Sequence, residues 1–530
     1  MDAIRLGAVL SLLVLACSSP GARSGDGGSG SGGSSTGGTG GNGGNAGTGG
    51  TSGTGGAPTP GGDTSVLQRG GDPARTHHFV RPAMTKAKAA ALVADDAFKA
   101  TFTGTVTGVP LYVESGPGGK GAFFVGTQNN DLFAFDETTG ATLWMKNAGP
   151  SATGACDNQG KGMMATPVID LKSRTIFAAA ANGPGLQSFK VHAYNIDDGS
   201  ERAGGWPVDL ATVVGGGTNL NKSNQRGALL LVNGILYVPF GGQVGDCTGA
   251  RGRVVAIDIA DPTKTGSWST GDDGSAIWGS GGVASDGAGV FAITGNHFPN
   301  FSAPATHADS EEVVRLTGLA QLARADSNIF FPKRWSAMDS GDLDFGSNSP
   351  AVFSVPGATP GKFVVAPAKD GHLYFLDAAN LGGMGGEKID LAVAQEGNSL
   401  FTSPAAYQTA KGTYVVLHAG GPHCPAGGNG KQIMGISVAV NAGAINPTVS
   451  WCAAHSSDTS PIVTTTDGKT DAVVWFMNGN ALKGVDGDTG AQVYSGGDCA
   501  GVQRWTTAIA AKGARIVAAG GGKLCSWSAM

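Results

Sequence analysis

The sequence is poor in charge and lacks the short motifs that mark several enzyme classes. Charged residues make up 14% of the 530 residues and the formal net charge is −5, so the sequence predicts no nucleic-acid partner. No CxxC or CxxCH motif occurs, which excludes thioredoxin-like redox chemistry, CxxC-type zinc sites and covalent c-type haem. There is also no HExxH, no glycine-rich phosphate loop opening a helix, and no Gly-x-Ser-x-Gly elbow in a strand-turn-helix context.

Long apolar runs are also missing after the N-terminus. The run Leu6 to Ala16 follows Arg5 and is too short for a stable membrane span, which is typical of a targeting segment. It ends in Val-Leu-Ala-Cys, which resembles a bacterial lipobox, so residues 1–17 are predicted to be a lipoprotein signal peptide with Cys17 as the lipidated residue. The alternative is an ordinary secretory peptide. We expect an outer-membrane lipoprotein of the cell envelope, periplasmic or surface-facing, whose membrane partner is reached through the lipid.

The next stretch has almost no apolar residues. Residues 24–62 consist mainly of Gly, Ser, Thr and Asn, and such a segment cannot offset the entropy lost on ordering. We therefore predict a disordered tether over residues 18–63, with a coil span of about 35 Å. The folded domain is predicted to occupy residues 64–530.

Cysteine is scarce but even in number once Cys17 is set aside. In an oxidising compartment the remaining six are expected to form disulfides. We predict three local pairs. The last four cysteines lie within one or two repeats of each other, and Cys156 and Cys247 lie in loops beside one presumed binding site. The pairs are Cys156–Cys247, Cys424–Cys452 and Cys499–Cys525.

A repeated hairpin organises the folded part. Phe123 to Val125 and Leu132 to Asp136 are predicted strands around a turn, and a third strand ends in Trp144. Asp136 is followed by Gly140 and then by Trp144, and the spacing recurs in Asp486, Gly490 and Tyr494. A hairpin with one wet face cannot bury its apolar face alone, so such units must stack on one another.

A second marker gives the number of units. The first strand of a unit opens with a small or hydroxyl residue followed by proline. The spacing of these prolines leaves room for two further units that lack the marker, and one more unit follows near the C-terminus. The eight starts are Val109-Pro110, Thr166-Pro167, the region of Arg226 to Ala228, Trp278-Gly279, Ser349-Pro350, Ser403-Pro404, Ser460-Pro461 and Trp505 to Thr507.

Eight such units predict an all-β fold, an eight-bladed β-propeller of four-stranded antiparallel blades, with an array of sandwiches as the alternative. Proline is tolerated on the innermost strand because that strand has a free edge on the channel. The last unit lacks a fourth strand, so we expect Phe98 to Gly104 to supply it and close the ring. A short helix is expected over Thr85 to Phe98.

These motifs resemble the quinoprotein alcohol dehydrogenase-like superfamily, the pyrroloquinoline quinone (PQQ) propellers. The best match is Phe124 to Thr127, Leu132 to Asp136 and Gly140 to Trp144, and the resemblance covers roughly Leu67 to the C-terminus. It implies PQQ-like repeats. It does not decide function, because outer-membrane assembly scaffolds share these repeats and bind no quinone.

The resemblance implies a site at the blade starts and nearby loops. In the superfamily enzymes PQQ lies over a Trp, calcium is bound by a Glu and an Asn, and a basic residue meets the quinone oxygens. Trp278 and Lys369 resemble the PQQ-binding residues, and Asn296, which follows Thr294-Gly295, resembles the calcium ligand. Each also has a purely structural interpretation: Trp278 as a packing residue, Lys369 as a residue before a hairpin turn, and Asn296 as a turn former.

Three positions depart from the superfamily pattern. Gln243 stands where the resemblance places the calcium-binding Glu, and the loss of that charge weakens a calcium site. Leu316, after Arg315, stands where the catalytic Asp is expected. Asp342 and Asp344 are the weak candidates for a replacement base, although they also suit a loop cap. Cys156 stands alone where some members carry adjacent cysteines.

The sequence therefore favours a cell-envelope lipoprotein that acts as a binding or assembly scaffold, without turnover. PQQ and calcium remain possible cofactors, and envelope proteins or a small alcohol or polyol remain possible partners. The alternative is a PQQ- and calcium-dependent alcohol or polyol dehydrogenase, and a carbohydrate-binding propeller is a third hypothesis.

Overall fold

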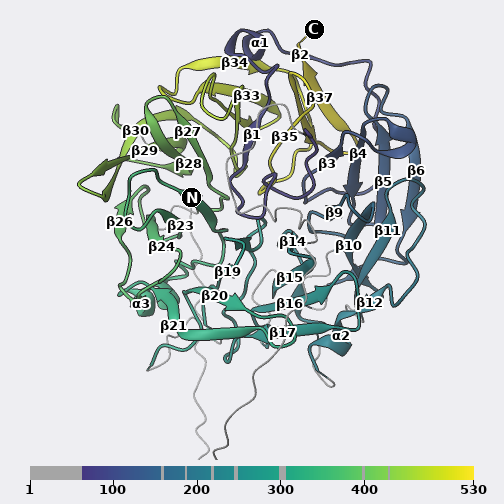
Figure 1. Cartoon of the computed structure of the whole chain (residues 1–530), viewed down its shortest axis with the longest axis horizontal. Helices are drawn as coiled ribbons and strands as arrows, with labels where there is room; N and C mark the ends of the chain where they lie inside the picture. Colours follow the sequence, from purple (N-terminus) through teal and green to yellow (C-terminus); the bar gives the residue numbers. More distant parts are fainter. Residues whose placement is uncertain are drawn as a thin grey trace, which may run out of the picture. The chain divides into compact units, whose positions relative to one another are not determined.

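A ring of eight small antiparallel sheets makes up the folded part of the chain (Figure 1). The computed structural model describes residues 63–154, 156, 160–184, 188–215, 220–243, 249–297, 306–396, 400–427 and 430–529. The predicted signal peptide, Cys17 and the predicted tether up to residue 62 lie outside the described residues. The predicted eight-bladed propeller is confirmed, and seven of the blades follow one another along the chain.

Blades 1 to 4 are built from consecutive strands, ordered from the channel outward. Blade 1 contains β3 (Leu111–Val113), β4 (Ala122–Gly126), β5 (Asp131–Asp136) and β6 (Thr142–Asn147). Blade 2 contains β9 (Val168–Asp170), β10 (Thr175–Asn182), β11 (Ser188–Asn195) and β12 (Val208–Asp209). Blade 3 contains β14 (Leu230–Val232), β15 (Ile235–Gly242), β16 (Arg253–Asp258) and β17 (Thr265–Ser269), and blade 4 contains β18 (Ala284–Ser285), β19 (Val290–Ile293), β20 (Val313–Thr317) and β21 (Ala323–Phe331).

Blades 5 to 8 repeat the pattern, and the last takes one strand from the N-terminal side. Blade 5 contains β22 (Ala351–Ser354), β23 (Lys362–Pro367), β24 (His372–Asp377) and β26 (Ile389–Ala392). Blade 6 contains β27 (Ala405–Thr409), β28 (Gly412–Gly420), β29 (Lys431–Asn441) and β30 (Ala444–Ala454). Blade 7 contains β31 (Ile462–Thr465), β32 (Val473–Asn478), β33 (Ala481–Asp486) and β34 (Gln492–Gly496), and blade 8 contains β35 (Ile509–Ala511), β36 (Arg515–Ala519), β37 (Leu524–Ser528) and β2 (Val93–Ala94).

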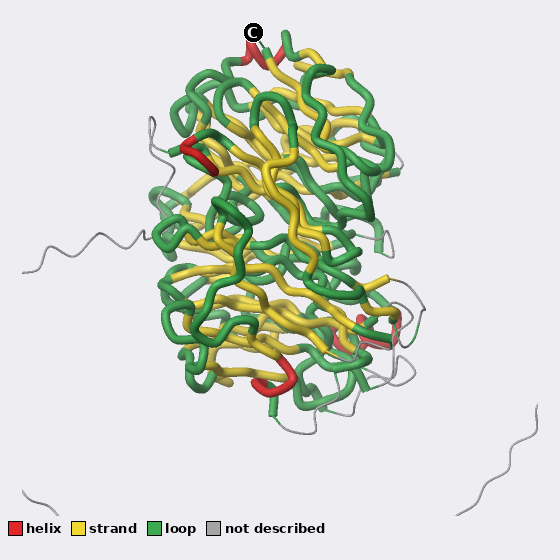
Figure 2. Tube along the Cα trace, turned by 90° about the vertical axis from the view of Figure 1, so that its right-hand side faces the viewer, coloured by secondary structure: helices red, strands yellow, loops and turns green. Residues whose placement is uncertain are grey.

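Little regular structure lies outside the blades (Figure 2). The helices are α1 (Lys86–Ala90), α2 (Leu210–Val213), α3 (Trp335–Gly341) and the 3₁₀ turn η1 (Pro117–Gly119); the added strands are β1 (His78–Val80), β7 (Ala152–Thr153), β8 (Gly160–Lys161), β13 (Ser223–Asn224) and β25 (Gly383–Met384). The helix expected over Thr85 to Phe98 is thus one turn, capped by the Thr85 side chain, because residues 93–94 join blade 8 instead. Across the described residues, no helix is long and apolar enough to cross a membrane.

The predicted repeat has a packing reason. The Asp136 carboxylate accepts hydrogen bonds from Thr138 N and Thr139 N and so shapes the turn before the last strand, which extends beyond Trp144 to Asn147. Trp144 then packs on the next blade, where its Nε1 donates to Ile196 O (2.9 Å). A Cβ on Gly199 would lie 2.8 Å from the indole, so glycine is required where the aromatic ring meets the neighbouring turn.

Neighbouring blades are also joined near the channel by the hydroxyl groups that open the inner strands. The bonds run from Val109 N to Thr166 Oγ1 (3.0 Å), from Ser403 N to Ser460 Oγ (2.9 Å) and from Thr506 Oγ1 to Gly108 O (2.9 Å). They connect blades 1 and 2, blades 6 and 7, and blades 8 and 1. A Ser or Thr at a blade start therefore stabilises the ring and not only its own strand.

The ring is closed by the N-terminal side of the chain, as predicted, but the strand begins earlier than expected. β2 pairs with β37 through Val93–Ser528 and Ala94–Trp527. The predicted segment continues this edge more loosely, with Leu524 N donating to Ala100 O (2.9 Å) and a bridge between Thr101 and Lys523. Closure therefore uses residues 93–102, and the regular pairing lies at the start of that range.

The free inner edge expected for the blades is instead occupied. We call residues 64–81 the axial segment, because they contact the inner strand of each blade in turn. Val66 pairs with Tyr112 in blade 1, and β1 pairs in parallel with β31 in blade 7. Between them, inner-strand amides donate to carbonyls of the segment: Ile169 N to Leu67 O, Ser285 N to Pro73 O, Val352 N to Ala74 O and Ala406 N to Thr76 O, all 2.8–2.9 Å.

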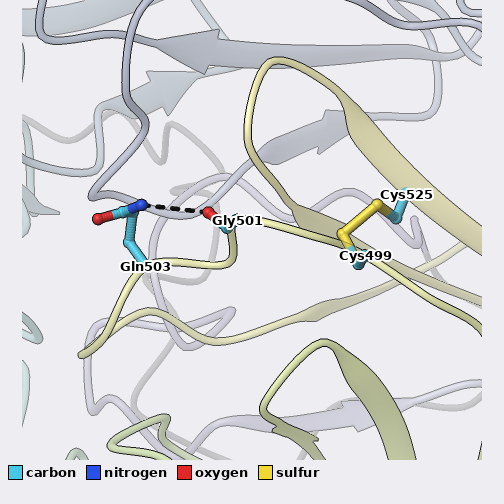
Figure 3. Close-up of a disulfide and its surroundings, with 4 residues drawn as sticks. All are labelled: Cys499, Gly501, Gln503 and Cys525. Carbon is cyan, nitrogen blue, oxygen red and sulfur yellow. Dashed lines mark hydrogen bonds between the residues drawn. A yellow bond between two sulfur atoms is a disulfide. The ribbon is translucent and has the colours of Figure 1, made fainter.

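Two of the three predicted disulfides are confirmed. Cys424–Cys452 joins the loop after β28 to β30 within blade 6, and Cys499–Cys525 joins the loop after β34 to β37 across blades 7 and 8. Figure 3 shows the second bond, with Gln503 Nε2 donating to Gly501 O in the same loop. Cys247 lies outside the described residues, so the pair Cys156–Cys247 stays a prediction.

Loss of the Cys499–Cys525 bond is expected to destabilise the seam of the ring. It closes a loop of sequence separation 26 and links blade 7 to the strand that carries β2, so its removal should cost about 2–4 kcal/mol. The measurement is the urea midpoint of a Cys499→Ser, Cys525→Ser double variant. The matched control is the Cys424→Ser, Cys452→Ser double variant, which removes a bond of similar span inside one blade. An unchanged rate of proteolysis at residues 93–102 in the first variant would contradict the seam role.

Candidate functional site

Three aromatic rings from separate blades meet at one mouth of the channel. Trp278, Phe401 and Trp505 lie in the loops that precede the inner strands of blades 4, 6 and 8. Their ring centroids are 5.6 Å apart for Trp278 and Phe401, 6.1 Å for Trp278 and Trp505, and 5.5 Å for Phe401 and Trp505. We call these residues the axial triad.

The triad lies on the axis of the propeller. Blades 4 and 8 stand opposite each other in the ring, so a contact between their opening loops has to cross the axis. Ser280 Oγ of blade 4 makes such a contact and donates to Trp505 O of blade 8 (2.7 Å). Each ring is half-buried and so is partly open to solvent. The triad forms the floor of this mouth.

Trp505 is held in a strained backbone conformation. Its φ of +67° is in the left-handed region, which is unfavourable for a bulky residue. Three hydrogen bonds fix the residue there: its N donates to Asp458 O, and its O accepts from Ser280 Oγ and Arg69 Nη2. Strain of this kind is often maintained at binding sites, because the surrounding structure offsets it to place a side chain.

Three cations surround the triad. Arg226 lies 4.6 Å from the Trp505 ring centroid and 5.9 Å from that of Trp278. Arg504 lies 4.5 Å from Trp505, and Lys369 Nζ lies 5.3 Å from Trp278 and 5.6 Å from Phe401. Cations at these distances are attracted by the ring faces. The mouth therefore combines flat apolar surface with positive charge.

The structure brings Lys369 together with Asp342 and Asp344. Lys369 Nζ forms ion pairs with Asp342 Oδ1 (3.0 Å) and with Asp344 Oδ2. Burial alone would lower the pKa of Lys369, but the two carboxylates outweigh it and raise that pKa. Burial raises the pKa of Asp344 to about 6, although Lys369 opposes the shift. Asp342, the left-handed C-cap of α3, has a side chain that is 58% exposed, so Asp344 is the buried partner.

Two further buried carboxyl groups lie behind this pair. Glu311 Oε2 accepts from Phe345 N (2.6 Å), and burial together with the carboxylates of Asp344 and Asp339 raises the pKa of Glu311 well above its usual value. Asp339 Oδ1 accepts from His297 N (2.8 Å), and burial raises the pKa of Asp339 as well. Buried acids with raised pKa values concentrate at functional sites more often than elsewhere.

The two predicted calcium ligands, Gln243 and Asn296, are both buried. Gln243 is buried and both of its polar atoms are engaged, since Oε1 accepts from Cys156 N (3.0 Å) and Nε2 donates to Asn221 O (2.5 Å). Asn296 is also buried, and its Nδ2 donor has no partner within the described part of the chain. A neutral amide whose oxygen is already bonded is a poor ligand for a hard cation. Within the same residues, no group of three His, Cys, Asp or Glu side chains suits a metal ion.

The structure places Leu316 in the core of blade 4. Leu316 pairs with Val290 in the middle of blade 4 and is fully buried in its core. Its neighbour Arg315 pairs with Asp286 (2.9 Å), in the turn between β18 and β19 at the other mouth of the channel. The segment therefore follows strand periodicity, and Leu316 contributes to the blade core.

Several residues of the mouth carried no site prediction from the sequence. Phe401, Arg504, Glu311 and Asp339 follow no repeat marker, while Arg226 and Trp505 were noted only as blade starts. For Arg226, Phe401, Arg504 and Trp505 the signal was positional, because like Trp278 they shortly precede an inner strand. Glu311 lies before β20 and Asp339 lies in α3, so these two carried no such signal. Because all inner strands run in the same direction, residues at equivalent positions meet at the same mouth.

The comparisons with known proteins bear on the fold. No protein-family model matches the sequence, and no curated protein does. Among solved structures, quinohemoprotein alcohol dehydrogenase from Comamonas testosteroni is similar at 14% identity and a TM-score of 0.60, over 88% of this chain and 80% of that chain. Quinohemoprotein alcohol dehydrogenase ADHIIG from Pseudomonas putida HK5 is similar at 10% identity and a TM-score of 0.62, over 88% and 80%.

A europium-containing methanol dehydrogenase is similar at 14% identity and a TM-score of 0.58, over 86% of this chain and 89% of that chain. The molecule is thus an eight-bladed β-propeller. Its fold is that of the quinoprotein alcohol dehydrogenases, as the repeat motifs predicted. At these identities the likeness establishes the fold alone.

Proposed function

We propose that the protein is a cell-envelope lipoprotein that binds a planar anionic ligand on the axial triad without turning it over. The observation that carries the proposal is the set of three aromatic rings faced by Arg226, Lys369 and Arg504. Indole faces suit stacking on a flat ring, and guanidinium groups suit carboxylates. PQQ, a planar polycarboxylate, belongs to this ligand class.

The residues of the mouth have different roles in binding. Trp278 and Trp505 provide the stacking surface, and Lys369, held by Asp344, is placed to face a carboxylate or a quinone oxygen. Binding is expected to be independent of calcium, because Gln243 uses its oxygen on Cys156 N. The lipid at Cys17 and the tether would keep this binding site at the outer membrane, where envelope proteins are possible partners.

A PQQ-dependent alcohol or polyol dehydrogenase is the second candidate. The observation that favours it is Asp344, whose pKa of about 6 and contact with Lys369 suit a general base at neutral pH. In that case PQQ would supply the oxidising chemistry, and Asp344 would take the proton from the substrate hydroxyl. Gln243, whose oxygen is engaged by Cys156 N, is a poor calcium ligand, and this argues against ordinary enzyme rates.

A titration of the purified full-length protein with PQQ tests the proposal. We expect saturable quenching of tryptophan fluorescence with a dissociation constant above about 1 μM, unchanged by calcium or EDTA. Trp278→Leu should weaken binding tenfold or more, because it removes a stacking face at the axis. Trp268→Leu, which changes a half-buried tryptophan on the outer strand β17, is the matched control and should leave binding unchanged.

Two results would contradict the proposal that the protein binds a ligand on the axial triad without turnover. Calcium-dependent binding with alcohol-dependent dye reduction at about 1 s⁻¹ or faster would establish the dehydrogenase, and Asp344→Asn should then abolish turnover while sparing binding. Equal binding by wild type and Trp278→Leu would show that the triad is not the site.

A further inference from the structure

A cavity lies at the mouth of the channel opposite the axial triad. It has a volume of about 340 Å³, which is in the range of small-molecule sites. The ends of the inner strands of blades 3 to 6 and the turn after β31 surround it, and residues 72–78 of the axial segment form its inner wall. Triad residues precede the inner strands, whereas the cavity residues come at their ends, so the two sites are separate.

The axial segment is fixed along this side of the cavity. The carbonyls of Pro73, Ala74 and Thr76 accept hydrogen bonds from the amides of Ser285, Val352 and Ala406, which also line the cavity. The inner wall is therefore held to the inner strands of blades 4, 5 and 6.

The walls are mostly apolar. Val352, Phe353, Ala406 and Tyr407 come from blades 5 and 6, and Pro73 faces them from the axial segment. Apart from Pro73, these side chains are buried in the fold, so they present a rigid and preformed surface. Such a surface suits the hydrocarbon body of a small ligand, because contact removes apolar surface of both the ligand and the wall from water.

One carboxylate in this wall has no direct ion pair. Asp72 is half-buried; its Oδ1 accepts from Thr76 N (3.2 Å) and its Oδ2 from Thr76 Oγ1. The guanidinium of its neighbour Arg75 donates to the carbonyls of Arg69, Val283 and Leu229, so its hydrogen bonds are used elsewhere. In the part of the chain that the structure describes, Asp72 has no ion pair. Burial raises the pKa of Asp72, although the hydrogen bonds from Thr76 and the charge of Arg75 oppose the shift.

The other titratable groups of the pocket leave this carboxylate unneutralised. Burial lowers the pKa of His78 to about 4, so the imidazole is neutral, and its Nε2 bonds Thr465 Oγ1. Asp467 accepts from the amides of its own turn, and Lys469 lies on the exposed part of the same turn at the rim. The inner wall therefore keeps one negative charge next to an apolar surface.

We propose that this pocket binds a small organic cation, a primary amine with an apolar or aromatic body. The ammonium group pairs with the Asp72 carboxylate, and the body lies against Phe353 and Tyr407. The pairing supplies the direct ion pair that Asp72 lacks among the described residues, in a site where water is partly excluded and a charge-assisted hydrogen bond is strong.

Isothermal titration of the full-length protein with 2-phenylethylamine, and with 2-phenylethanol as its neutral analogue, tests the proposal. We expect the wild type to prefer the amine tenfold or more at neutral pH. Asp72→Asn keeps the hydrogen bonds to Thr76 but removes the charge, so it should abolish the preference while weak binding of both compounds remains. Ser354→Leu, which adds bulk at an exposed position of the cavity wall, should weaken both compounds, and Trp278→Leu at the other mouth should change neither.

The dependence on pH gives a second test. Protonation of Asp72 removes the charge that the ammonium needs, so affinity for the amine should fall as the pH drops through the raised pKa of Asp72, whereas affinity for the alcohol should stay constant. The proposal is overturned if wild type binds the two compounds equally, if neither binds at millimolar concentration, or if Asp72→Asn keeps the preference for the amine.

Discussion

A chain that begins at Val109 should fail to form a stable ring, whereas one that begins at Thr64 should fold. The shorter chain loses β2, which is the outer strand of blade 8, and the whole axial segment. It also loses Phe79, Met84 and Phe98 from a core cluster that they share with blades 1, 7 and 8. The exposed edges and the missing apolar groups should make the protein aggregate or melt without a cooperative transition.

A chain that begins at Thr85 separates the two contributions. It keeps α1 and the closing strand but lacks the axial segment, so the inner strands lose the carbonyl partners of their amides. We expect a soluble ring with a midpoint between those of the other two chains, measured by calorimetry and by the rate of proteolysis. Equal stability of the chains that begin at Val109 and Thr64 would rule out both roles of the N-terminal region.

Replacing Arg75 by methionine should be strongly destabilising, and the same change at Arg69 should not. Arg75 is buried, and its guanidinium bonds the carbonyls of Arg69, Val283 and Leu229 at 2.6–3.0 Å. Arg75→Met would leave these acceptors buried and unpaired, at a cost of about 3–5 kcal/mol. The urea midpoint of the full-length protein measures the effect.

Arg69 is the matched control, because it is equally buried but poorly paired. Its Nη2 donates to Trp505 O, while Nε and Nη1 have no partner among the described residues. Burial and the charge of Arg75 lower the pKa of Arg69 to about 9, so its charge is not stabilised where it lies. Arg69→Met should therefore change stability by less than about 1 kcal/mol. Equal losses in the two variants would show that volume, and not hydrogen bonding, matters in the channel.

Local chemistry in the sequence was enough to predict the blades and two of the disulfides. The turn made by Asp136 and closed by Gly140, and the hydroxyl and proline at blade starts such as Ser460-Pro461, act over a few residues. Such signals repeat along the chain, so they specify strands, turns and the number of units. The sequence also predicted Trp278 and Lys369 as site residues, because they resemble positions of a known motif. It predicted Asp344 because this residue lies near that motif.

The axis of the propeller was decided by the tertiary structure. Phe401 and Trp505 join Trp278 only because the ring closes and brings the loops of blades 4, 6 and 8 to one mouth. The oxygen of Gln243 is engaged by Cys156, a contact across 87 positions that no local pattern encodes. The axial segment has no repeat of its own, since its successive contacts are made with different blades. Contacts at the centre of a ring join residues far apart in sequence, so periodicity specifies the blades but not what lies between them.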